Sequence, residues 1–262
     1  MNHSVLHLTH TDIRSDSRIL KEMISLDSLC SKYGYMLYGI GLESNENSKI
    51  SDSARHLNLI VCPNALIRPF KKIRLIYHFL QLVMLLIFSL RIILKIKPKI
   101  IHCHDTLVLP IALIAKIIYK STLIYDAHEL ESNRNSQGYI SSIITKFIEK
   151  IAWKNITLFI TVSPSISEWY INNFGYKENI TILNSPLLNQ DSEVKNSKFN
   201  LRKKLNIQND KKIYVYLGIF GQGRGIENIL EVFANFNIDA HLLFVGWGPL
   251  KNEIQRFVNL YK

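Results

Sequence analysis

Residues 99–132 read KIIHCHDTLVLPIALIAKIIYKSTLIYDAHELES, and this stretch decides the fold. Residues 99–103 and 122–125 are short runs, apolar on both faces and rich in β-branched side chains, which is typical of strands that helices cover on both sides. Residues 107–119 between them have the length and apolar spacing of a helix. A strand, a helix and a second strand in this order predict part of a doubly wound α/β domain with a parallel sheet.

The same alternation continues on both sides of this unit. Further strands are expected at residues 5–8, 35–42, 57–62, 158–162 and 181–183, and further helices at 17–32, 70–96, 138–153 and 164–174. Seven strands and five helices are enough to enclose one hydrophobic core. Residues 1–186 are therefore expected to form a complete N-terminal Rossmann-like domain.

The character of the chain changes after residue 186. Residues 187–212 are polar and basic, and they predict a linker that holds one short helix. A second β/α pattern then begins, with strands expected at 213–220 and 241–246 and helices at 226–236 and 250–260. Because two β/α units cannot close a doubly wound sheet, residues 213–262 are expected to be the first part of a second Rossmann-like domain.

Composition and cysteine spacing narrow the class of protein. The 262 residues are 47% apolar and 20% charged, which excludes disordered and fibrous chains. Cys30, Cys62 and Cys103 lie far apart without CxxC spacing, so neither a zinc ribbon nor a disulfide framework is indicated. The first ten residues lack the basic start and apolar core of a signal peptide, so the expected location is the cytoplasm.

The positive charge is concentrated in parts of the chain, whose formal net charge is +11. Residues 68–99 hold eight Lys or Arg residues and no acidic one. The apolar run inside them, residues 75–90, contains His78 and Gln81 and is shorter than the roughly 18–20 residues of a membrane span. Two interpretations stay open, namely a helix that lies on anionic lipid at the inner face of the membrane and a buried core helix.

A second basic cluster runs from Lys195 to Lys212 and falls in the expected linker. It contains seven Lys or Arg residues, but no aromatic residues alternate with them in the manner of a nucleic-acid surface, and no known nucleic-acid module is present. Nucleic acid is therefore not expected as a partner.

Polar side chains follow five of the expected strands. These residues are Thr9-His10-Thr11-Asp12, His104-Asp105, Asp126-Ala127-His128-Glu129, Ser163 and Asn184-Ser185. Ligands of open parallel sheets bind beyond the carboxyl ends of the strands. The five sets therefore predict a binding cleft at this edge of the sheet.

A glycine-rich turn, GIFGQGRGIENIL at residues 218–230, joins an expected strand to an expected helix. Glycines let the backbone approach a phosphate closely, the helix start offers unpaired N–H groups, and Arg224 adds a cation. The turn matches neither GxGxxG with an acidic residue about 20 positions on nor GxxxxGK[ST]. A phosphate site of another kind, or a turn with no ligand, is therefore indicated.

These stretches resemble the retaining glycosyltransferases of family 4, which have the GT-B fold. The stretches that carry the resemblance are DSRILKE (16–22), HCHD (102–105), LIYDAHELES (123–132), TVSPSISEWY (161–170), ILNSP (182–186), YLGIFGQGRGIENILE (216–231) and HLLFVGWGPLKNEI (241–254). The resemblance implies an N-terminal domain that binds a glycan or lipid-linked glycan acceptor and a C-terminal domain that binds a nucleotide-sugar donor. It also implies transfer in the cleft between them, in cell-surface polysaccharide synthesis, without a metal or other cofactor.

The resemblance assigns roles to individual residues. His128 matches the histidine near the donor sugar and is the expected catalytic residue. The expected donor-binding residues are Gly218, Gly221, Arg224 and Gly225. The expected acceptor-side residues are Arg18, His104, Asp105 and Glu129.

Two features depart from the family pattern. Many members carry a second basic residue directly after the first glycine of the turn, where this chain has Ile219. The family's donor-binding motif of two glutamates separated by seven residues belongs farther along the C-terminal domain than residue 262. The resemblance therefore implies a C-terminally truncated enzyme.

Two other functions fit the same residues. The first is a metal-dependent hydrolase, whose site could be formed by His102, His104, Asp105 and His128, with Asp126 and Glu129 nearby. Taken alone, however, His102 fits a buried core histidine equally well. The chain could also be a non-catalytic remnant that binds a glycan without transferring a sugar. The sequence contains no DxD motif, the usual metal-binding motif of the other large glycosyltransferase class.

Overall fold

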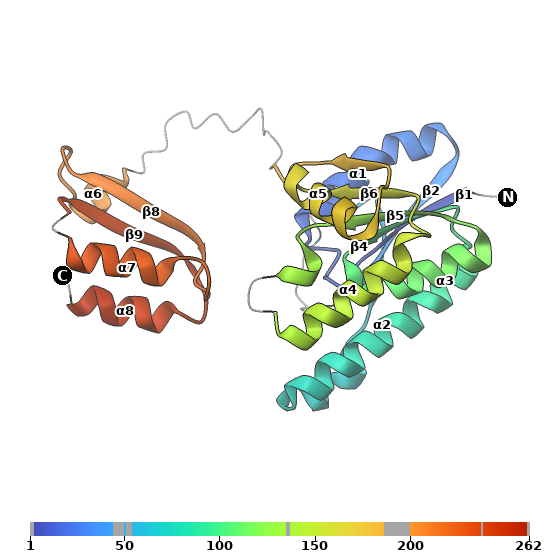
Figure 1. Cartoon of the computed structure of the whole chain (residues 1–262), viewed down its shortest axis with the longest axis horizontal. Coiled ribbons are helices and arrows are strands. Elements are labelled where there is room, and N and C mark those ends of the chain that lie inside the picture. Colours follow the sequence, from blue (N-terminus) through green and yellow to red (C-terminus); the bar gives the residue numbers. More distant parts are fainter. Residues whose placement is uncertain are drawn as a thin grey trace. The chain divides into compact units, whose positions relative to one another are not determined.

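The computed structural model describes residues 3–43, 50, 54–134, 137–185, 200–236 and 238–260, without the side chains of residues 71, 74 and 75. The chain divides into two compact units, Met1–Leu187 and Leu188–Lys262, whose elements Figure 1 labels. Half of the expected linker, residues 187–199, lies outside the described residues, as does Pro186 before it. The rest contains the short helix α6 (Leu201–Leu205), which begins after Asn200.

The first unit contains a seven-stranded sheet in which all strands are parallel. Its strands are β1 (His3–Leu8), β2 (Tyr35–Leu42), β3 (Asn58–Cys62), β4 (Ile100–His104), β5 (Thr122–Ala127), β6 (Leu158–Thr161) and β7 (Asn179–Thr181). Their order in the sheet is β3-β2-β1-β4-β5-β6-β7. The expected α/β class with a parallel sheet is confirmed.

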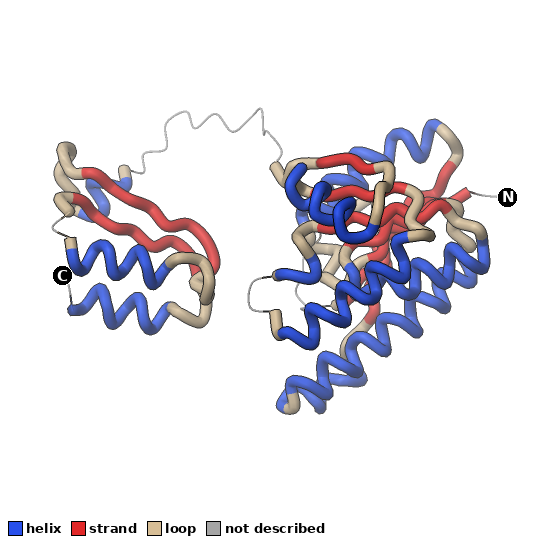
Figure 2. The backbone as a smooth tube through the Cα atoms, viewed as in Figure 1, coloured by secondary structure: helices blue, strands red, loops and turns tan. Residues whose placement is uncertain are grey.

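Helices lie on both faces of this sheet, as the tube in Figure 2 shows. They are α1 (Ser17–Lys32), α2 (Arg74–Ile96), α3 (Leu109–Tyr119), α4 (Tyr139–Trp153) and α5 (Pro164–Phe174), with short 3₁₀ helices η2 (Ala65–Lys72), η3 (Thr106–Val108) and η4 (Glu131–Asn133). The larger core lies between the sheet and α2 to α5. The smaller core joins the opposite face to α1. This division follows from right-handed crossovers, because the chain runs one way across the sheet from β1 to β2 and the other way from β4 onward.

Local sequence explains where individual elements start. The side chain of Asp16 accepts hydrogen bonds from the backbone N–H groups of Arg18 and Ile19 and so caps α1. Ser163 caps α5 by accepting from the N–H of Ile166, and Pro164 occupies the first turn, where no N–H is needed. These caps place each helix directly after the carboxyl edge of the sheet.

Two expected elements differ from the observed ones. The helix expected at 70–96 is divided, because η2 contains Pro69 and Ile73 has a non-helical backbone before α2 begins at Arg74. The last strand is Asn179–Thr181 rather than 181–183, because β6 ends at Thr161, which pairs with Thr181. Residues 182 and 183 are β-branched or apolar but extend beyond the end of β6.

Helix α2 is longer and more apolar than the sequence run at 75–90 suggested. Residues Ile76–Ile96 form a continuous stretch of 21 residues with a mean hydropathy of 2.2, which is long and apolar enough to cross a membrane. Length alone therefore does not exclude a span. However, Leu85, Ser89 and Ile93 are fully buried, and two of them belong to the larger core, as in a helix packed on a sheet.

The second unit contains two parallel strands, β8 (Lys212–Ile219) and β9 (Ala240–Trp247). Helices α7 (Ile226–Asn235) and α8 (Lys251–Leu260) accompany them. A small core of five buried residues holds the unit together, namely Phe220, Ile226, Leu230, Leu250 and Ile254. The expected strand–helix–strand–helix order is observed among the described residues of this unit.

Candidate functional site

Four histidine side chains gather near the carboxyl ends of the central strands. His7 lies in β1, His102 and His104 lie in β4, and His128 follows β5. Nδ1 of His7 is 2.9 Å from Nε2 of His104, and Nδ1 of His104 is 3.2 Å from Nε2 of His128. Oδ2 of Asp126 lies 3.2 Å from His128 Nε2, 3.4 Å from His102 Nε2 and 3.5 Å from His104 Nδ1. We call these five residues the histidine cluster.

The register of the sheet explains this cluster. His7 lies opposite His102 in the β1–β4 pair, and His104 lies opposite Asp126 in the β4–β5 pair. Alternate residues of a strand share a face. The side chains that lie on the same face of the sheet are therefore those of His7, His102, His104 and Asp126. Neighbouring residues such as Cys103 face the larger core on the other side.

His128 lies in a negatively charged environment. Its burial alone would lower the pKa of the imidazole, but the nearby carboxylates of Asp126 and Asp105 outweigh this effect and raise the pKa of His128 above its ordinary value. Its Nε2 contacts Asp126, whereas the buried Nδ1 has no hydrogen-bond partner among the described residues and lies 3.9 Å from Oδ1 of Asp105. A protonated His128 could therefore donate Nδ1–H to a ligand.

Two other histidines of the cluster, His7 and His104, favour the neutral form. Burial and the imidazoles of His102 and His104 hold the pKa of His7 well below its usual range. Burial and His102 lower the pKa of His104 to about 4. Burial opposes ionisation of Asp126, but hydrogen bonds from the surrounding imidazoles hold its pKa well below the ordinary value. The carboxylate of Asp126 therefore favours positive charge at His128, whose pKa it raises.

Asp105 follows β4 with an unusual backbone. Its φ of 70° and ψ of 159° lie in a region that side chains rarely adopt and that is found where surrounding contacts enforce it. Arg134 donates to Oδ1 at 3.1 Å, and Nδ1 of His10 lies 3.1 Å from Oδ2. Arg134 also pairs with Glu131 from η4. These contacts fix the Asp105 carboxylate beside His128.

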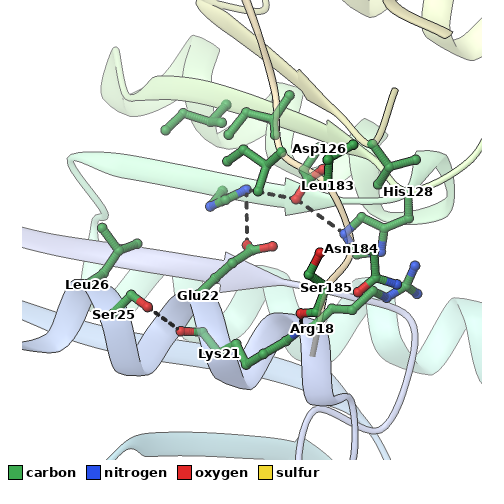
Figure 3. Close-up of a pocket in the computed structure, with 15 residues that line it drawn as sticks. Arg18, Lys21, Glu22, Ser25, Leu26, Asp126, His128, Leu183, Asn184 and Ser185 are labelled. Carbon is green, nitrogen blue, oxygen red and sulfur yellow. Dashed lines mark hydrogen bonds and ion pairs between the residues drawn. The ribbon is translucent and has the colours of Figure 1, made fainter. Parts of the chain in front are cut away.

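A pocket of about 450 Å³ opens next to the histidine cluster (Figure 3). One side of the pocket is formed by Arg18, Lys21 and Glu22 of α1. Another side is formed by Asn184 and Ser185, which follow β7. Apolar side chains of the sheet and the chain after it line the rest, namely Ile124, Ile160, Val162, Ile182 and Leu183, with Leu26 of α1. Nζ of Lys21 donates to the backbone oxygen of Ser185 at 2.5 Å and joins the two sides. His102, Asp126 and His128 also line this pocket, so the histidine cluster is open to a ligand there.

The expected acceptor-side residues do not all meet at this pocket. Arg18 lines it, but His104 is fully buried within the cluster and Asp105 is held by His10 and Arg134. The side chain of Glu129 is 60% exposed and lies 3.9 Å from Arg134 Nε. Ser163 caps α5 and, among the described residues, is not part of the pocket lining.

Two overlapping groups in the described residues could hold a metal ion. The first is His7, Glu22, His102 and His104, and the second is Glu22, His104, Asp126 and His128. The metal interpretation from sequence named His102, His104, Asp105 and His128, but neither described group contains Asp105 or combines His102 with His128.

The glycine-rich turn lies in the second unit. Gly225 has a φ of 74° and immediately precedes α7, whose first N–H groups therefore face the turn. A Cβ on Gly221 would lie 3.9 Å from Cδ and Nε of Arg224, so the exposed arginine side chain lies over this glycine. Gly218 falls within β8. A cation beside the start of a helix can bind an anionic group such as a phosphate.

Sequence analysis missed two residues of the site. His7 lies inside an expected strand and Glu22 inside an expected helix, whereas most of the candidates were residues that follow strands. The signal was present, because a histidine in an apolar strand is unusual among buried side chains. Glu131 and Arg134, which hold Asp105, lie on the loop after LIYDAHE and were also missed.

Comparison with solved structures identifies proteins with the same fold. The chain matches the lipopolysaccharide outer core galactosyltransferase WaaB with a TM-score of 0.59 and 10% identity, covering 98% of this chain and 65% of WaaB. It matches sucrose-phosphate synthase from Thermosynechococcus elongatus with a TM-score of 0.64 and 16% identity, covering 99% of this chain and 68% of the synthase. Anabaena HepE, solved with UDP-glucose, matches with a TM-score of 0.63 and 15% identity, covering 98% of this chain and 66% of HepE. The neighbours are GT-B glycosyltransferases, so the fold is of the GT-B type.

Sequence comparison gives the family. No curated protein matches the chain. The model of Glycosyltransferase Family 4 matches residues 49–186, which are more than half of the chain and include His102, His104, Asp126 and His128. The chain therefore belongs to glycosyltransferase family 4.

Proposed function

We propose that the protein transfers a sugar, with retention of anomeric configuration, from a nucleotide-sugar donor to a glycan or lipid-linked glycan acceptor in cell-surface polysaccharide synthesis. The observation that carries this proposal is the position of His128, an imidazole whose pKa Asp126 and Asp105 raise, at the carboxyl edge of the sheet beside an open pocket. HepE, a structural neighbour, has been solved with UDP and with UDP-glucose, which supports a nucleotide-sugar donor for this chain.

The proposed chemistry follows from the charges that develop during transfer. The bond between the anomeric carbon and the phosphate oxygen breaks, the sugar gains oxocarbenium character, and the diphosphate leaves with its negative charge. The acceptor hydroxyl oxygen forms the new bond and gives up its proton. His128 would contact the sugar, and Arg224 with the start of α7 would stabilise the diphosphate, so the proposed step uses no metal ion.

The direct test is to offer the protein a panel of nucleotide sugars with glycan and lipid-linked acceptors and to identify the products by mass spectrometry. The proposal expects one donor to yield a glycosylated acceptor whose anomeric configuration, read by NMR, equals that of the donor. Acceptor binding without transfer from any donor would favour the glycan-binding alternative. Inversion of configuration would contradict the retaining mechanism.

Arg224 provides a prediction for donor binding. Replacing Arg224 with alanine should weaken the binding of the matching nucleoside diphosphate by about 10- to 150-fold, because a charge-assisted contact to phosphate contributes about 1.5–3 kcal/mol. Isothermal titration calorimetry measures this affinity. Arg256→Ala is a matched control, since Arg256 is an exposed arginine of α8 in the same unit. Equal affinities of Arg224→Ala and the unaltered protein would remove Arg224 from the donor site.

We also propose that the first unit binds an anionic membrane surface, where a lipid-linked acceptor can be reached. Helix α3 packs against both α2 and α4, and the outer sides of these helices expose large apolar residues. These are Ile76, Phe79, Ile87 and Leu94 of α2, Ile117 of α3, and Ile140, Ile143, Ile144, Phe147 and Ile151 of α4, which we call the α2–α4 face. Exposed basic residues accompany it, among them Arg91, Lys95, Lys146 and Lys150. Apolar side chains with surrounding cations are typical of a protein surface that lies on anionic lipid.

Vesicle binding tests the α2–α4 face. The protein should bind vesicles in proportion to their anionic lipid content and should dissociate as salt is added, because exposed charges are screened over about 8–10 Å at physiological ionic strength. The double substitution Phe79→Asp with Phe147→Asp should weaken binding roughly tenfold or more in a sedimentation assay, since two exposed aromatic side chains that would become buried in the membrane are lost. Tyr176→Ser, at an exposed aromatic residue outside this face, is the control. If the double variant binds vesicles as well as the control does, the α2–α4 face is not the membrane contact.

A further inference from the structure

One group of possible metal ligands lies where β1, β4 and α1 meet. This first group contains His7, Glu22, His102 and His104. The ring centroids of His7 and His102 are 4.6 Å apart, and those of His102 and His104 are 4.3 Å apart. Glu22 reaches this group from α1, with Oε2 at 3.7 Å from His102 Nε2 and 3.9 Å from His104 Nε2. Three imidazoles and one carboxylate thus converge on one point beneath α1.

Several polar atoms at this point make no hydrogen bond within the described residues, although His102 Nε2 lies 3.7 Å from Glu22 Oε2 and 3.4 Å from Asp126 Oδ2. His7 Nε2, His102 Nε2 and Glu22 Oε2 are buried, and none makes a hydrogen bond to the described residues. Buried polar atoms are nearly always satisfied, because an unsatisfied one loses its interactions with water without replacement. Three such atoms in one small group indicate that something binds there.

The donor atoms fit a divalent transition-metal ion. One donor atom from each of His7, Glu22, His102 and His104 lies within 4.8 Å of all the others. A tetrahedral zinc ion with bonds of about 2.0–2.1 Å holds its ligands about 3.4 Å apart, so side-chain adjustments of about 1 Å would close the site. Imidazole nitrogen with one carboxylate oxygen is a donor set that Zn²⁺ accepts readily.

The surroundings support such an ion. Asp126 Oδ2, at 3.5 Å from His104 Nδ1, can accept Nδ1–H while Nε2 of His104 binds the metal, an arrangement common around zinc-bound histidines. Metal binding through His104 Nε2 would replace its contact with His7 Nδ1. Glu22 and His102 line the 450 Å³ pocket, which gives an ion a route from solvent (Figure 3).

We propose that His7, Glu22, His102 and His104 bind one Zn²⁺ ion that ties α1 to β1 and β4. The first group is favoured over the second because three of its residues, His7, Glu22 and His102, have a buried atom without a hydrogen bond, whereas only Glu22 and His128 of the second group do. This site goes beyond the proposed sugar transfer, no step of which depends on it. Its expected effect is on the stability of the first unit, because a ligand that binds only the folded chain raises the melting temperature.

The test uses the whole chain after treatment with a chelator and dialysis. Titration with Zn²⁺ should show one ion bound per chain with micromolar or tighter affinity, together with a higher melting temperature. Co²⁺ should give the intense visible absorption of a four-coordinate site. Glu22→Gln, a conservative change of a half-buried residue, should lower the Zn²⁺ affinity about tenfold or more and leave the chain folded. His78→Ala, on the exposed side of α2, should change neither quantity.

Three results would overturn the proposal. The first is the absence of stoichiometric Zn²⁺ binding by the unaltered chain. The second is equal Zn²⁺ affinity of Glu22→Gln and the unaltered chain. The third is loss of binding in His128→Ala with retention in His7→Ala, which would move the ion to the second group. Because the readouts are metal content and melting temperature, they are independent of whether the protein transfers a sugar.

Discussion

Replacing His128 with alanine is expected to lower the rate of sugar transfer by roughly a hundredfold or more. The substitution removes the imidazole whose pKa the carboxylates of Asp126 and Asp105 raise, and with it the Nδ1–H group that is free of hydrogen-bond partners among the described residues. The loss should appear mainly in kcat, because a contact to the donor sugar that strengthens as the bond to the diphosphate breaks acts on the transition state. Steady-state kinetics with the matching donor and acceptor measure this effect.

Two comparisons make the His128 result specific. His78→Ala removes an exposed histidine from α2 and should retain full transfer activity. Circular dichroism and the unfolding midpoint of His128→Ala should show that the sheet is intact. A folded His128→Ala protein with nearly unchanged kcat would exclude this residue from the transfer step.

The second large effect is expected for stability, at Glu149 in α4. This carboxylate is fully buried, and its Oε1 accepts hydrogen bonds from Tyr125 at 2.7 Å, Tyr170 at 2.5 Å and Thr106 at 3.1 Å. Glu149→Leu should lower the free energy of unfolding by about 2–4 kcal/mol, because each buried hydroxyl left without an acceptor costs about 1–3 kcal/mol. Denaturant unfolding followed by circular dichroism provides the measurement.

Glu149→Gln is the matched variant, because it keeps a carbonyl oxygen for these hydroxyls and should lose less stability than Glu149→Leu. Burial raises the pKa of Glu149 in the folded protein above its ordinary 4.5. The folded state therefore holds the proton more tightly, and this contribution to stability is present below pH 4.5 and is lost as the pH rises through the raised pKa. The difference in stability between the unaltered protein and Glu149→Gln should thus shrink as the pH rises above 4.5. Equal stability of the Leu and Gln variants would show that the three hydroxyls do not depend on this acceptor.

The sequence alone predicted most of the fold because its strands and helices differ in period and length. Residues 99–132 alternate in the manner of a β-α-β unit, and the structure has β4, α3 and β5 there. One of the two errors fell where the deciding information was not local. The end of β7 depends on where its neighbour β6 stops, at Thr161, and no property of residues 179–183 themselves carries that information.

The candidate site was predictable to the extent that it follows strand ends. His104, Asp105, Asp126 and His128 were identified in this way, and they lie together in the structure. His7 and Glu22 join them only because of the strand register and the placement of α1, which are properties of the assembled sheet. Glu149 could not be found from sequence, since its three hydroxyl partners lie between 21 and 43 positions away along the chain.

The strand order of the first unit has a consequence for where a ligand can lie. The order β3-β2-β1-β4-β5-β6-β7 changes direction between β1 and β4, so β1 and β4 form a topological switch point. Crossovers on the two sides of this point pass over opposite faces of the sheet. Ile124 of β5 and Ile160 of β6 line the same pocket as His128. The reversal of winding thus brings the histidine cluster and an apolar wall of this pocket together at the carboxyl edge of the sheet.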